Sequence, residues 1–374
     1  MVQAGRHVSV AMTARVHVAA LALRDPVAAA DRTHGRRRTI FLELDDGDVV
    51  GWGECATAEE PGSDATVDEV LGALSDRVLA LAVAQLDATP SGASPRAPTV
   101  SMVPARPSEL AAAALVDAAL WDRRLRSAGE SLASDLGVSV PEVGFAGVIG
   151  IEEGSAAVER AMALVAAGVT RLRIKVSRAS GTAALDAVLD AVHVPVVADA
   201  NASLRAREDA RVLDALCERP IAWLEQPFAA GNLADHAELA ARGEVLVGLD
   251  ESVRSIRAVR DAARYGAAGV VCVKPPRLGG LARALEAMRE ASSLGLAAYV
   301  GGYFEAGLGR AVLGALSAAA GTLDGDVAAP SGYLVADPCS LAATTGGRQP
   351  LHLGPGCGPA PDRAVLRLVD VAVR

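Results

Sequence analysis

The sequence is poor in aromatic residues and has neither paired cysteine motifs nor long apolar runs. Aromatic residues make up 3% of its 374 residues and hydrophobic residues 51%, so Ala, Val and Leu must build the core. The 5 cysteines include no CxxC pair, which argues against a zinc site and against a secreted disulfide framework. No apolar run is long enough to span a membrane, and there is no signal-peptide pattern. We therefore expect a cytoplasmic protein with no membrane partner.

The charge balance is acidic, with a formal net charge of −9 and an isoelectric point near 5.3. This balance argues against a broad basic surface, so we expect no nucleic-acid partner. The arginine-rich stretch Gly35-Arg36-Arg37-Arg38 is short and isolated. We interpret it first as a solvated loop and second as a loop that faces a small-molecule substrate.

The first 138 residues predict a small α+β domain. Strand patterns are followed by helical spacing, at 16–23, 39–44 and 49–54 for the strands and 66–84 and 107–128 for the helices. Strands followed by helices are typical of an α+β arrangement. In the tail 345–374, the apolar stretch 364–369 is expected to return to this domain as a strand.

Residues 139–344 have a stricter rhythm, in which apolar runs alternate with Ala-rich helical stretches. The runs lie at 143–150, 171–176, 194–199, 221–225, 245–250, 269–274 and 297–301, with a weaker eighth run at 322–327. They are continuous in Val, Leu and Ile, as is typical of parallel strands buried on both faces. Seven or eight such units predict a closed parallel α/β barrel.

Five charged residues each end one of these runs: Lys175, Asp199, Glu225, Asp250 and Lys274. The intervals between them are 24, 26, 25 and 24 residues, so they occupy equivalent places on successive units. In a parallel barrel the active site lies at this end of the strands. Strands two and six face each other in a ring of eight, which places the two lysines across the mouth and the three carboxylates on the arc between them.

This set of charges favours a metal-assisted reaction. Three converging carboxylates repel one another unless a cation lies between them, and oxygen ligands suit Mg²⁺, with Mn²⁺ as the alternative. A lysine beside such an ion can remove the proton alpha to a carboxylate. Taken singly, Asp199 could be a helix cap and either lysine a surface residue. Five charges in phase favour a site.

The motifs around these residues resemble those of the enolase superfamily, in its muconate-lactonizing-enzyme subgroup. They are Gly51-Trp52-Gly53-Glu54, Ala118-Ala119-Leu120-Trp121-Asp122, Asp199-Ala200-Asn201, Glu225-Gln226-Pro227, Asp250-Glu251-Ser252 and Lys274-Pro275. The resemblance implies a modified TIM barrel, (β/α)7β, with an N-terminal capping domain, assembled as a homo-oligomer, either dimer or octamer. It implies that Asp199, Glu225 and Asp250 bind the metal and that Lys175 and Lys274 are the acid/base pair. Asn201 and Glu251 would orient these groups.

Two further segments are similar to the o-succinylbenzoate synthase and N-succinylamino-acid racemase group. They are 148–153 and 301–311, and the second supplies Gly302 and Glu305 as candidates for substrate binding. One departure is Arg173, where the subgroup usually has the first lysine of Lys-x-Lys. Arg173 should share a strand face with Lys175, because residues i and i+2 do so. Its fixed charge can hold a carboxylate or favour the neutral form of Lys175.

These resemblances imply a Mg²⁺-dependent lyase that acts on a small carboxylate. The leading expectation is dehydration of 2-succinyl-6-hydroxy-2,4-cyclohexadiene-1-carboxylate to o-succinylbenzoate, a step of menaquinone biosynthesis. Racemisation of N-succinylamino acids or epimerisation of dipeptides comes next, followed by muconate-type cycloisomerisation. A metal-binding barrel without catalysis stays open, with Arg173 as the one feature in its favour. Substrate choice is expected in cap loops near 25–37 and 52–60.

Overall fold

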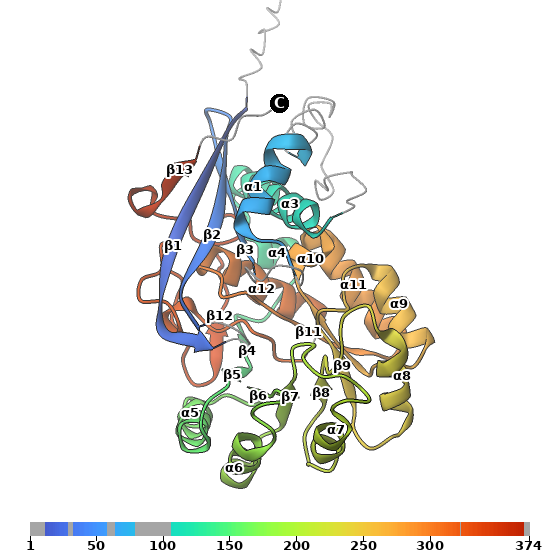
Figure 1. Ribbon diagram of the computed structural model, residues 1–374. Helices are drawn as coiled ribbons and strands as arrows, with labels where there is room; N and C mark the ends of the chain where they lie inside the picture. Colours follow the sequence, from blue (N-terminus) through green and yellow to red (C-terminus); the bar gives the residue numbers. More distant parts are fainter. Residues whose placement is uncertain (1–11, 29–32, 58–63, 79–105, 322, 370–374) are drawn as a thin grey trace, which may run out of the picture.

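The computed structural model describes residues 12–28, 33–57, 64–78, 106–321 and 323–369. An antiparallel sheet with its helices forms a cap, and a curled parallel sheet surrounded by helices forms the barrel (Figure 1). The predicted α/β barrel with an N-terminal α+β cap is confirmed. Among the described helices, none is both long and apolar enough to cross a membrane.

The cap contains a four-stranded antiparallel sheet in the order β13-β1-β2-β3. Its elements are β1 (Thr13–Ala28), β2 (Thr33–Asp45), β3 (Val50–Ala56), α1 (Val67–Ala73), the π-helical turn η1 (Leu74–Val78), α3 (Pro107–Ala128), α4 (Leu132–Asp135), the 3₁₀ turn η3 (Arg363–Val365) and β13 (Arg367–Val369). The last strand comes from the C-terminal tail and pairs with β1. The helix predicted over 66–84 ends at Ala73 and continues as η1, and residues 79–84 lie outside the described part.

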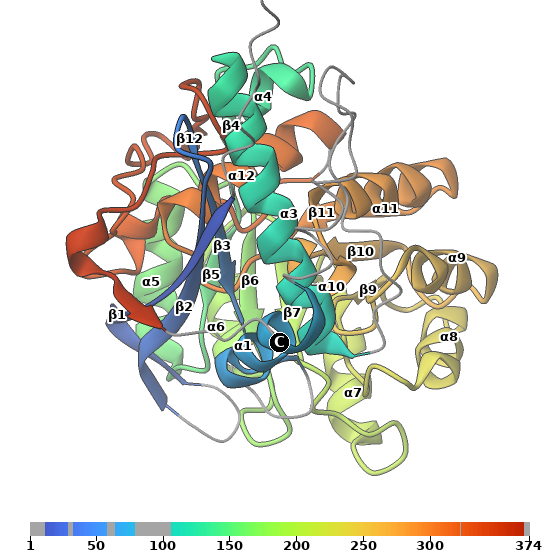
Figure 2. The same cartoon turned by 90° about the horizontal axis from the view of Figure 1, so that it is seen from above.

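Helix α3 packs directly on β3 because two glycines leave room for it (Figure 2). A Cβ atom on Gly53 would lie 2.2 Å from the carbonyl oxygen of Leu115, and one on Gly51 would lie 2.6 Å from that of Ala119. Both distances are far below van der Waals contact, so the Gly-Trp-Gly-Glu motif first serves this close approach.

The interpretation of residues 35–38 as a solvated loop is wrong. These residues belong to β2, where Arg36, Arg37 and Arg38 pair with residues 20–22 of β1. Arg37 is buried and its Nη2 donates to the carbonyl oxygens of Thr57 (2.7 Å) and Tyr303 (3.1 Å). A guanidinium has five N–H donors, so a buried arginine can be satisfied by backbone carbonyls.

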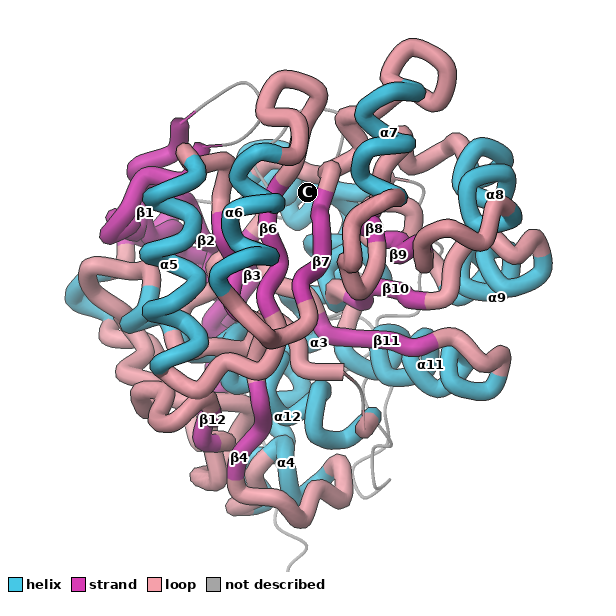
Figure 3. The backbone as a smooth tube through the Cα atoms, turned by 90° about the horizontal axis from the view of Figure 1, so that it is seen from below, coloured by secondary structure: helices cyan, strands magenta, loops and turns pink. Residues whose placement is uncertain are grey.

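The barrel sheet has seven parallel strands in the order β11-β10-β9-β8-β7-β6-β5. Strands and helices alternate as β5 (Gly147–Ile149), α5 (Gly154–Ala166), β6 (Leu172–Lys175), α6 (Ala183–Ala191), β7 (Val196–Asp199), α7 (Ala210–Cys217), β8 (Leu224–Glu225), α8 (Leu233–Ala241), β9 (Val247–Leu249), α9 (Ile256–Arg264), β10 (Val270–Val273), α10 (Pro275–Leu278), α11 (Leu281–Ser293), β11 (Ala297–Val300), α12 (Gly307–Ala320) and the 3₁₀ turn η2 (Pro330–Gly332). Helices α5 to α9 and α11 lie around the outside of the curled sheet (Figure 3).

The eighth run closes the ring with a few backbone hydrogen bonds. On one side, Leu323 and Asp326 donate to Ala298 and Val300 of β11 (3.0 and 2.8 Å). On the other side, the Gly325 carbonyl accepts from Ala146, just before β5 (2.8 Å). Both contacts are parallel bridges, so residues 323–326 occupy the predicted eighth position.

The first run, predicted as one barrel strand over 143–150, is divided between two sheets. Its start forms β4 (Glu142–Gly144), which pairs antiparallel with β12 (Arg348–Pro350), and only β5 joins the barrel. Gly144 allows this change because a Cβ there would lie 2.4 Å from the carboxylate of Asp324. An apolar run alone does not show which partner its backbone will pair with.

Candidate active site

The five charged residues gather at one end of the barrel sheet. Lys175, Asp199 and Glu225 end β6, β7 and β8, and they pair in register from strand to strand. Asp250 and Lys274 come directly after β9 and β10. The three carboxylates and Lys274 are buried, and Lys175 is partly buried. The arrangement expected from the spacing is therefore present in space.

All three carboxylates have a cation beside them. Nη1 of Arg173 lies 2.9 Å from Oε1 of Glu225, and its Nε lies 3.9 Å from Oδ2 of Asp199. Nζ of Lys274 lies 2.8 Å from Oδ2 of Asp250. Burial is the largest single influence on the Lys274 ammonium and lowers its pKa, but the negative charge of Asp250, together with Cys272 and Glu251, raises that pKa above its ordinary value.

The three carboxylates are close enough to act on one another. Burial raises the pKa of Glu225 to about 7, with Arg173 lowering it and the charges of Asp199 and Asp250 raising it. Such an oxygen-only set suits a divalent cation of the Mg²⁺ kind in its chemistry. Within the described part of the chain, however, no three acidic, His or Cys side chains already surround a common point. Arg173 and Lys274 take carboxylate oxygens instead.

Asn201 connects the strand-two lysine to the carboxylates. The ammonium of Lys175 donates to Oδ1 of Asn201, and Nδ2 of Asn201 donates to Oδ2 of Asp199 (3.2 Å) and Oε1 of Glu251 (3.4 Å). Glu251 is buried, and burial together with the charge of Asp250 raises its pKa to about 7. The structure thus places Asn201 and Glu251 beside the charged set, as expected.

Arg173 lies at the centre of a buried charge cluster. Besides Glu225, it donates to Oδ2 of Asp326 (2.7 Å) and to the hydroxyl of Tyr299 (3.1 Å). Asp326 comes from the segment that closes the ring, and Tyr299 from β11. Neither residue was predicted for the site. The one available signal for Tyr299 was its position in an apolar run of a chain with only 4 tyrosines.

Gly302 and Glu305 lie in the loop after β11 but form a different cluster. Oε1 of Glu305 accepts from the backbone N–H of Tyr303 (2.7 Å), and Oε2 lies 3.2 Å from Nη2 of Arg310. A Cβ on Gly302 would lie 2.6 Å from Oε2 of Glu305, so the glycine leaves space for this pair. Among the described residues, the Glu305 side chain bonds to Tyr303 and Arg310 and to neither lysine.

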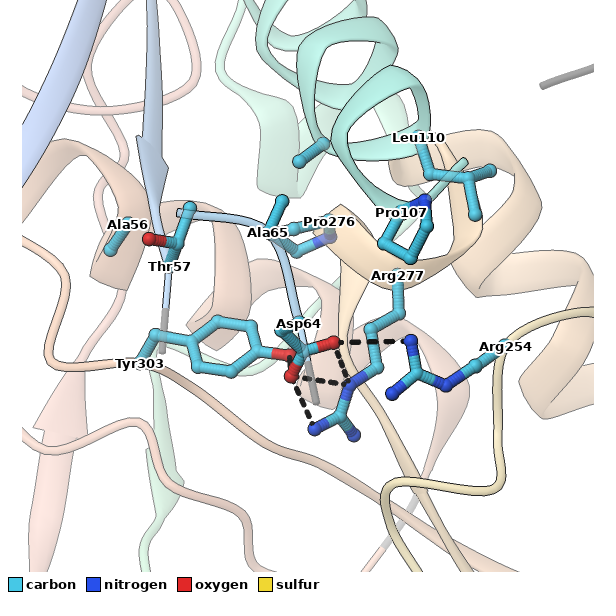
Figure 4. A pocket seen from close by; sticks show the side chains of 11 residues that line it. Ala56, Thr57, Asp64, Ala65, Pro107, Leu110, Arg254, Pro276, Arg277 and Tyr303 are labelled. Carbon is cyan, nitrogen blue, oxygen red and sulfur yellow. Dashed lines mark hydrogen bonds and ion pairs between the residues drawn. The ribbon is translucent and has the colours of Figure 1, made fainter. Parts of the chain in front are cut away.

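The cap reaches the same end of the barrel at a small pocket (Figure 4). Asp64 of the cap, Arg254 and Arg277 of the barrel loops, and Tyr303 after β11 line it. Nη1 of Arg277 lies 2.5 Å from Oδ1 of Asp250, so the pocket adjoins the charged set. None of these four residues was singled out from the sequence. Of the expected lid loops, residues 29–32 and 58–60 lie outside the described part.

Comparison with known proteins agrees with this geometry over nearly the whole chain. Residues 11–137 match the family described as "Mandelate racemase / muconate lactonizing enzyme, N-terminal domain", and residues 156–365 match "Enolase C-terminal domain-like". An o-succinylbenzoate synthase of Geobacillus stearothermophilus is 33% identical, over 83% of this chain and 82% of its own. An N-succinylamino acid racemase of Amycolatopsis sp. is 30% identical, over 86% and 87%.

A solved structure from Alicyclobacillus acidocaldarius, described as "Probable Mandelate Racemase", superimposes with a TM-score of 0.84. It is 30% identical and covers 96% of this chain and 98% of its own. Two family matches and relatives of this identity and coverage define the family. The chain belongs to the enolase superfamily and is an enzyme of the lyase or racemase type.

Proposed function

We propose that this enzyme removes the proton alpha to a substrate carboxylate and catalyses dehydration to o-succinylbenzoate. The observation that carries the proposal is the use of lysine. The chain has 34 arginines and only two lysines, Lys175 and Lys274, and both lie at the mouth of the barrel. Arginine keeps its proton at any physiological pH and serves for ion pairs, whereas lysine can act as a base. Both lysines of the sequence thus lie where the proposed reaction takes place.

The surroundings of the two lysines support different roles. Lys274 is buried and bonded to the Asp250 carboxylate, which keeps it an ammonium. Lys175 is partly buried and bonded to the neutral side chain of Asn201. An amine beside a neutral acceptor loses its proton more readily than one beside a carboxylate. Lys175 is therefore the proposed base, and Lys274 the fixed positive charge across the mouth.

A single base is enough for the dehydration of 2-succinyl-6-hydroxy-2,4-cyclohexadiene-1-carboxylate. Lys175 takes the proton alpha to the carboxylate and then gives a proton to the leaving hydroxyl group. Water departs, the ring becomes aromatic and Lys175 is again neutral, so atoms and charge balance. Lys274 keeps its proton throughout and stabilises the negative charge that develops on the substrate.

Asp199, Glu225 and Asp250 are the proposed ligands of Mg²⁺, with Mn²⁺ as the alternative. When bound, the ion would supply a Lewis acid for the substrate carboxylate. Asn201 and Glu251 orient Lys175 and the ligands, and Arg173 balances the charge of Glu225 from the barrel interior. A cytoplasmic location and assembly into a dimer or octamer stay predictions from the sequence.

Racemisation or epimerisation is the second candidate, because both lysines are present and a relative is named N-succinylamino acid racemase. The test is to incubate the enzyme with Mg²⁺ and the cyclohexadiene substrate, and separately with N-succinylamino acids in deuterium oxide. Formation of o-succinylbenzoate supports dehydration, and exchange of the alpha proton on both enantiomers supports racemisation. Absence of turnover of the cyclohexadiene substrate by the wild-type enzyme would rule out the first proposal.

The wild-type enzyme and its Lys175→Ala variant also test the two remaining alternatives. Turnover of cis,cis-muconate would support a cycloisomerase. If Lys175→Ala retained wild-type affinity for every ligand and the wild type turned over none of them, the barrel would be a binding protein without catalysis.

A further inference from the structure

Asp64 is an acid of the cap that inserts among cations of the barrel (Figure 4). Nε of Arg277 lies 3.0 and 3.1 Å from its two carboxylate oxygens, and Nη2 of Arg277 lies 2.8 Å from Oδ2. Nη1 of Arg254 lies 3.5 Å from Oδ1, and the Tyr303 hydroxyl donates to Oδ2 (2.8 Å). One cap carboxylate thus contacts three barrel residues, which come from the segments that follow β9, β10 and β11.

Arg277 is shared between the cap and the proposed metal ligands. The edge of its guanidinium that faces away from Asp64 donates to Asp250 through Nη1, to the carbonyl oxygen (2.9 Å) and to Oδ1 (2.5 Å). The Arg277 side chain is 4% exposed and that of Asp64 is 8% exposed. Paired, buried hydrogen bonds of this type fix a planar guanidinium in one orientation. The position of Arg277 against Asp250 therefore depends on Asp64.

Tyr303 is a second residue through which the cap contacts the charged set. Its ring lies 4.6 Å from Nζ of Lys274, measured to the ring centroid. The cap holds both ends of this residue, because Asp64 accepts from the hydroxyl and Arg37 donates to the backbone carbonyl (3.1 Å). Seating the cap thus positions the aromatic face beside Lys274 as well as the arginine beside Asp250.

The alternative interpretation is that Asp64 only attaches the cap to the barrel. Glu54 is a contact of that kind: among the described residues, its oxygens accept from the backbone N–H groups of Ala306 and Gly309, at the start of α12 (2.6 and 2.7 Å). Asp64 differs because its main partner, Arg277, also bonds to Asp250, one of the proposed metal ligands. Burial alone would raise the pKa of Asp64, but Arg277, Lys274 and Arg254 hold that pKa below its ordinary value.

We propose that Asp64 is a positioning residue through which the seated cap holds Arg277 against Asp250 and Tyr303 against Lys274. The Lys274 side of the site is then complete only when the cap is closed, so substrate enclosure and assembly of the site are one event. This inference rests on the proposed function for its kinetic consequence, but the contact itself does not depend on any substrate.

The kinetic test compares four variants of the full-length enzyme. Asp64→Asn keeps the size of the side chain and removes its charge, and Asp64→Glu keeps the charge. Glu54→Gln alters another cap–barrel contact, and Asp68→Asn alters an exposed cap acid that pairs with Arg38. We expect Asp64→Asn to lower kcat by about tenfold or more, because small displacements of site groups have effects of this size. Asp64→Glu should retain part of the wild-type kcat, and Asp68→Asn should have the same kcat as the wild type.

Glu54→Gln is the matched control for loosening of the cap alone, and it should raise KM more than it lowers kcat. If Asp64→Asn gave the same pattern, with kcat retained, Asp64 would be a domain contact only and the proposal would be overturned.

Hydrogen exchange separates this proposal from the proposed function. In Asp64→Asn, the backbone amides of Arg277 and Leu278 in α10 and of residues 303–306 should exchange faster than in the wild type, whereas Glu54→Gln should leave the two α10 amides unchanged. A wild-type enzyme that turned over none of the substrates would remove the proposed function but leave this comparison valid. Equal protection of α10 in Asp64→Asn and the wild type would show that Asp64 does not position Arg277.

Discussion

The ammonium of Lys175 donates a hydrogen bond to the side-chain oxygen of Asn201, whose backbone has a φ of 44°. This left-handed conformation is adopted mainly by glycine and by short polar residues such as Asn and Asp. The turn after β7 thus favours a residue that presents a short side chain, and Asn provides an acceptor without negative charge. The proposed base therefore faces a neutral group, while the opposite lysine faces a carboxylate.

Asn201→Asp should move the pH dependence of kcat. Aspartate tolerates the same backbone conformation, so the main change is a negative charge beside Lys175. That charge favours the protonated form of the base, so the rising limb of the kcat–pH profile should move upward by about one unit or more. Asn232→Asp, at the start of α8, is the control and should leave the profile unchanged. An unshifted profile in Asn201→Asp would argue against Lys175 as the base.

The two lysines should respond differently to replacement by arginine. Arginine keeps the positive charge but does not give up its proton. Lys274→Arg should retain more dehydration activity than Lys274→Met, because only the charge is needed at this position. Lys175→Arg should lose at least about 10²-fold in kcat. If Lys274→Arg and Lys175→Arg were equally inactive in o-succinylbenzoate formation, both lysines would transfer protons and racemase-type chemistry would be favoured.

Arg173 should contribute strongly to stability. Arg173→Met leaves Glu225 and Asp326 buried without their cation, and losing one partner of a buried pair costs about 3–5 kcal/mol. Arg205 offers a comparison at the surface, since it pairs with Glu208 and the two side chains are 70% and 54% exposed. Arg205→Met should cost less than about 1 kcal/mol. Urea unfolding of both variants measures the difference, and similar losses would contradict the assigned role of Arg173.

Glu54 should make the folded protein less stable as the pH rises. Burial raises the pKa of Glu54 to about 8 from its ordinary value of 4.5, even though the N–H groups of Gly309 and Ala306 act in the opposite direction. Between these values the folded protein holds a proton that the unfolded chain has released. The contribution of Glu54 to the free energy of unfolding is therefore largest below pH 4.5. It falls as the pH rises to about 8, by at most about 1.4 kcal/mol per pH unit.

Glu54→Gln should remove this part of the pH dependence, because the amide does not titrate. The measurement is the free energy of unfolding in urea at several pH values from 5 to 8, compared between the variant and the wild type. Other buried acids, such as Asp117, contribute equally to both proteins. Parallel curves for the two proteins would show that Glu54 is ionised throughout.

Gly53 should tolerate no side chain. In Gly53→Ala the new Cβ would meet the Leu115 carbonyl, a backbone atom of α3 that cannot rotate away. Overpacking of this kind costs about 1–3 kcal/mol or more. Gly72 lies in α1 with open space around it, so Gly72→Ala should be neutral or stabilise the protein by about 0.5–1 kcal/mol. In thermal unfolding, the melting temperature of Gly53→Ala should therefore fall, whereas that of Gly72→Ala should rise or stay the same.

The repeating part of the fold could be predicted from the sequence, because a charged residue after an apolar run marked the end of each of five strands. Lys175, Asp199 and Glu225 could be placed side by side from spacing alone, since one βα unit has a nearly constant length. Residues outside that repeat were missed. Asp64 and Arg277 are 213 positions apart, and no local pattern indicates that they pair. Arg37 was placed in a loop because three consecutive arginines do not resemble a strand.

The positions of the two lysines were visible in the sequence, and they are stronger evidence for the location of the active site than any single motif. The same count also clarifies Arg173, because arginine supplies every other side-chain ammonium or guanidinium cation of the chain. The division of the first run between β4 and β5 could not be predicted, because it depends on β12, a strand that starts more than 200 residues later.

The hydrogen bond between Arg173 and Asp326 joins residues that are 153 positions apart, and the segment that carries Asp326 also completes the ring. During synthesis, the strands that supply the carboxylates are made well before this segment. Contacts of such long range form late, because the intervening chain must first be ordered. The charges of the site stay unbalanced until the last barrel segment docks. A ribosome-bound chain that ends before residue 323 should consequently expose Glu225 and Arg173 to water, and its folding should be completed only after nearly the whole polypeptide has emerged.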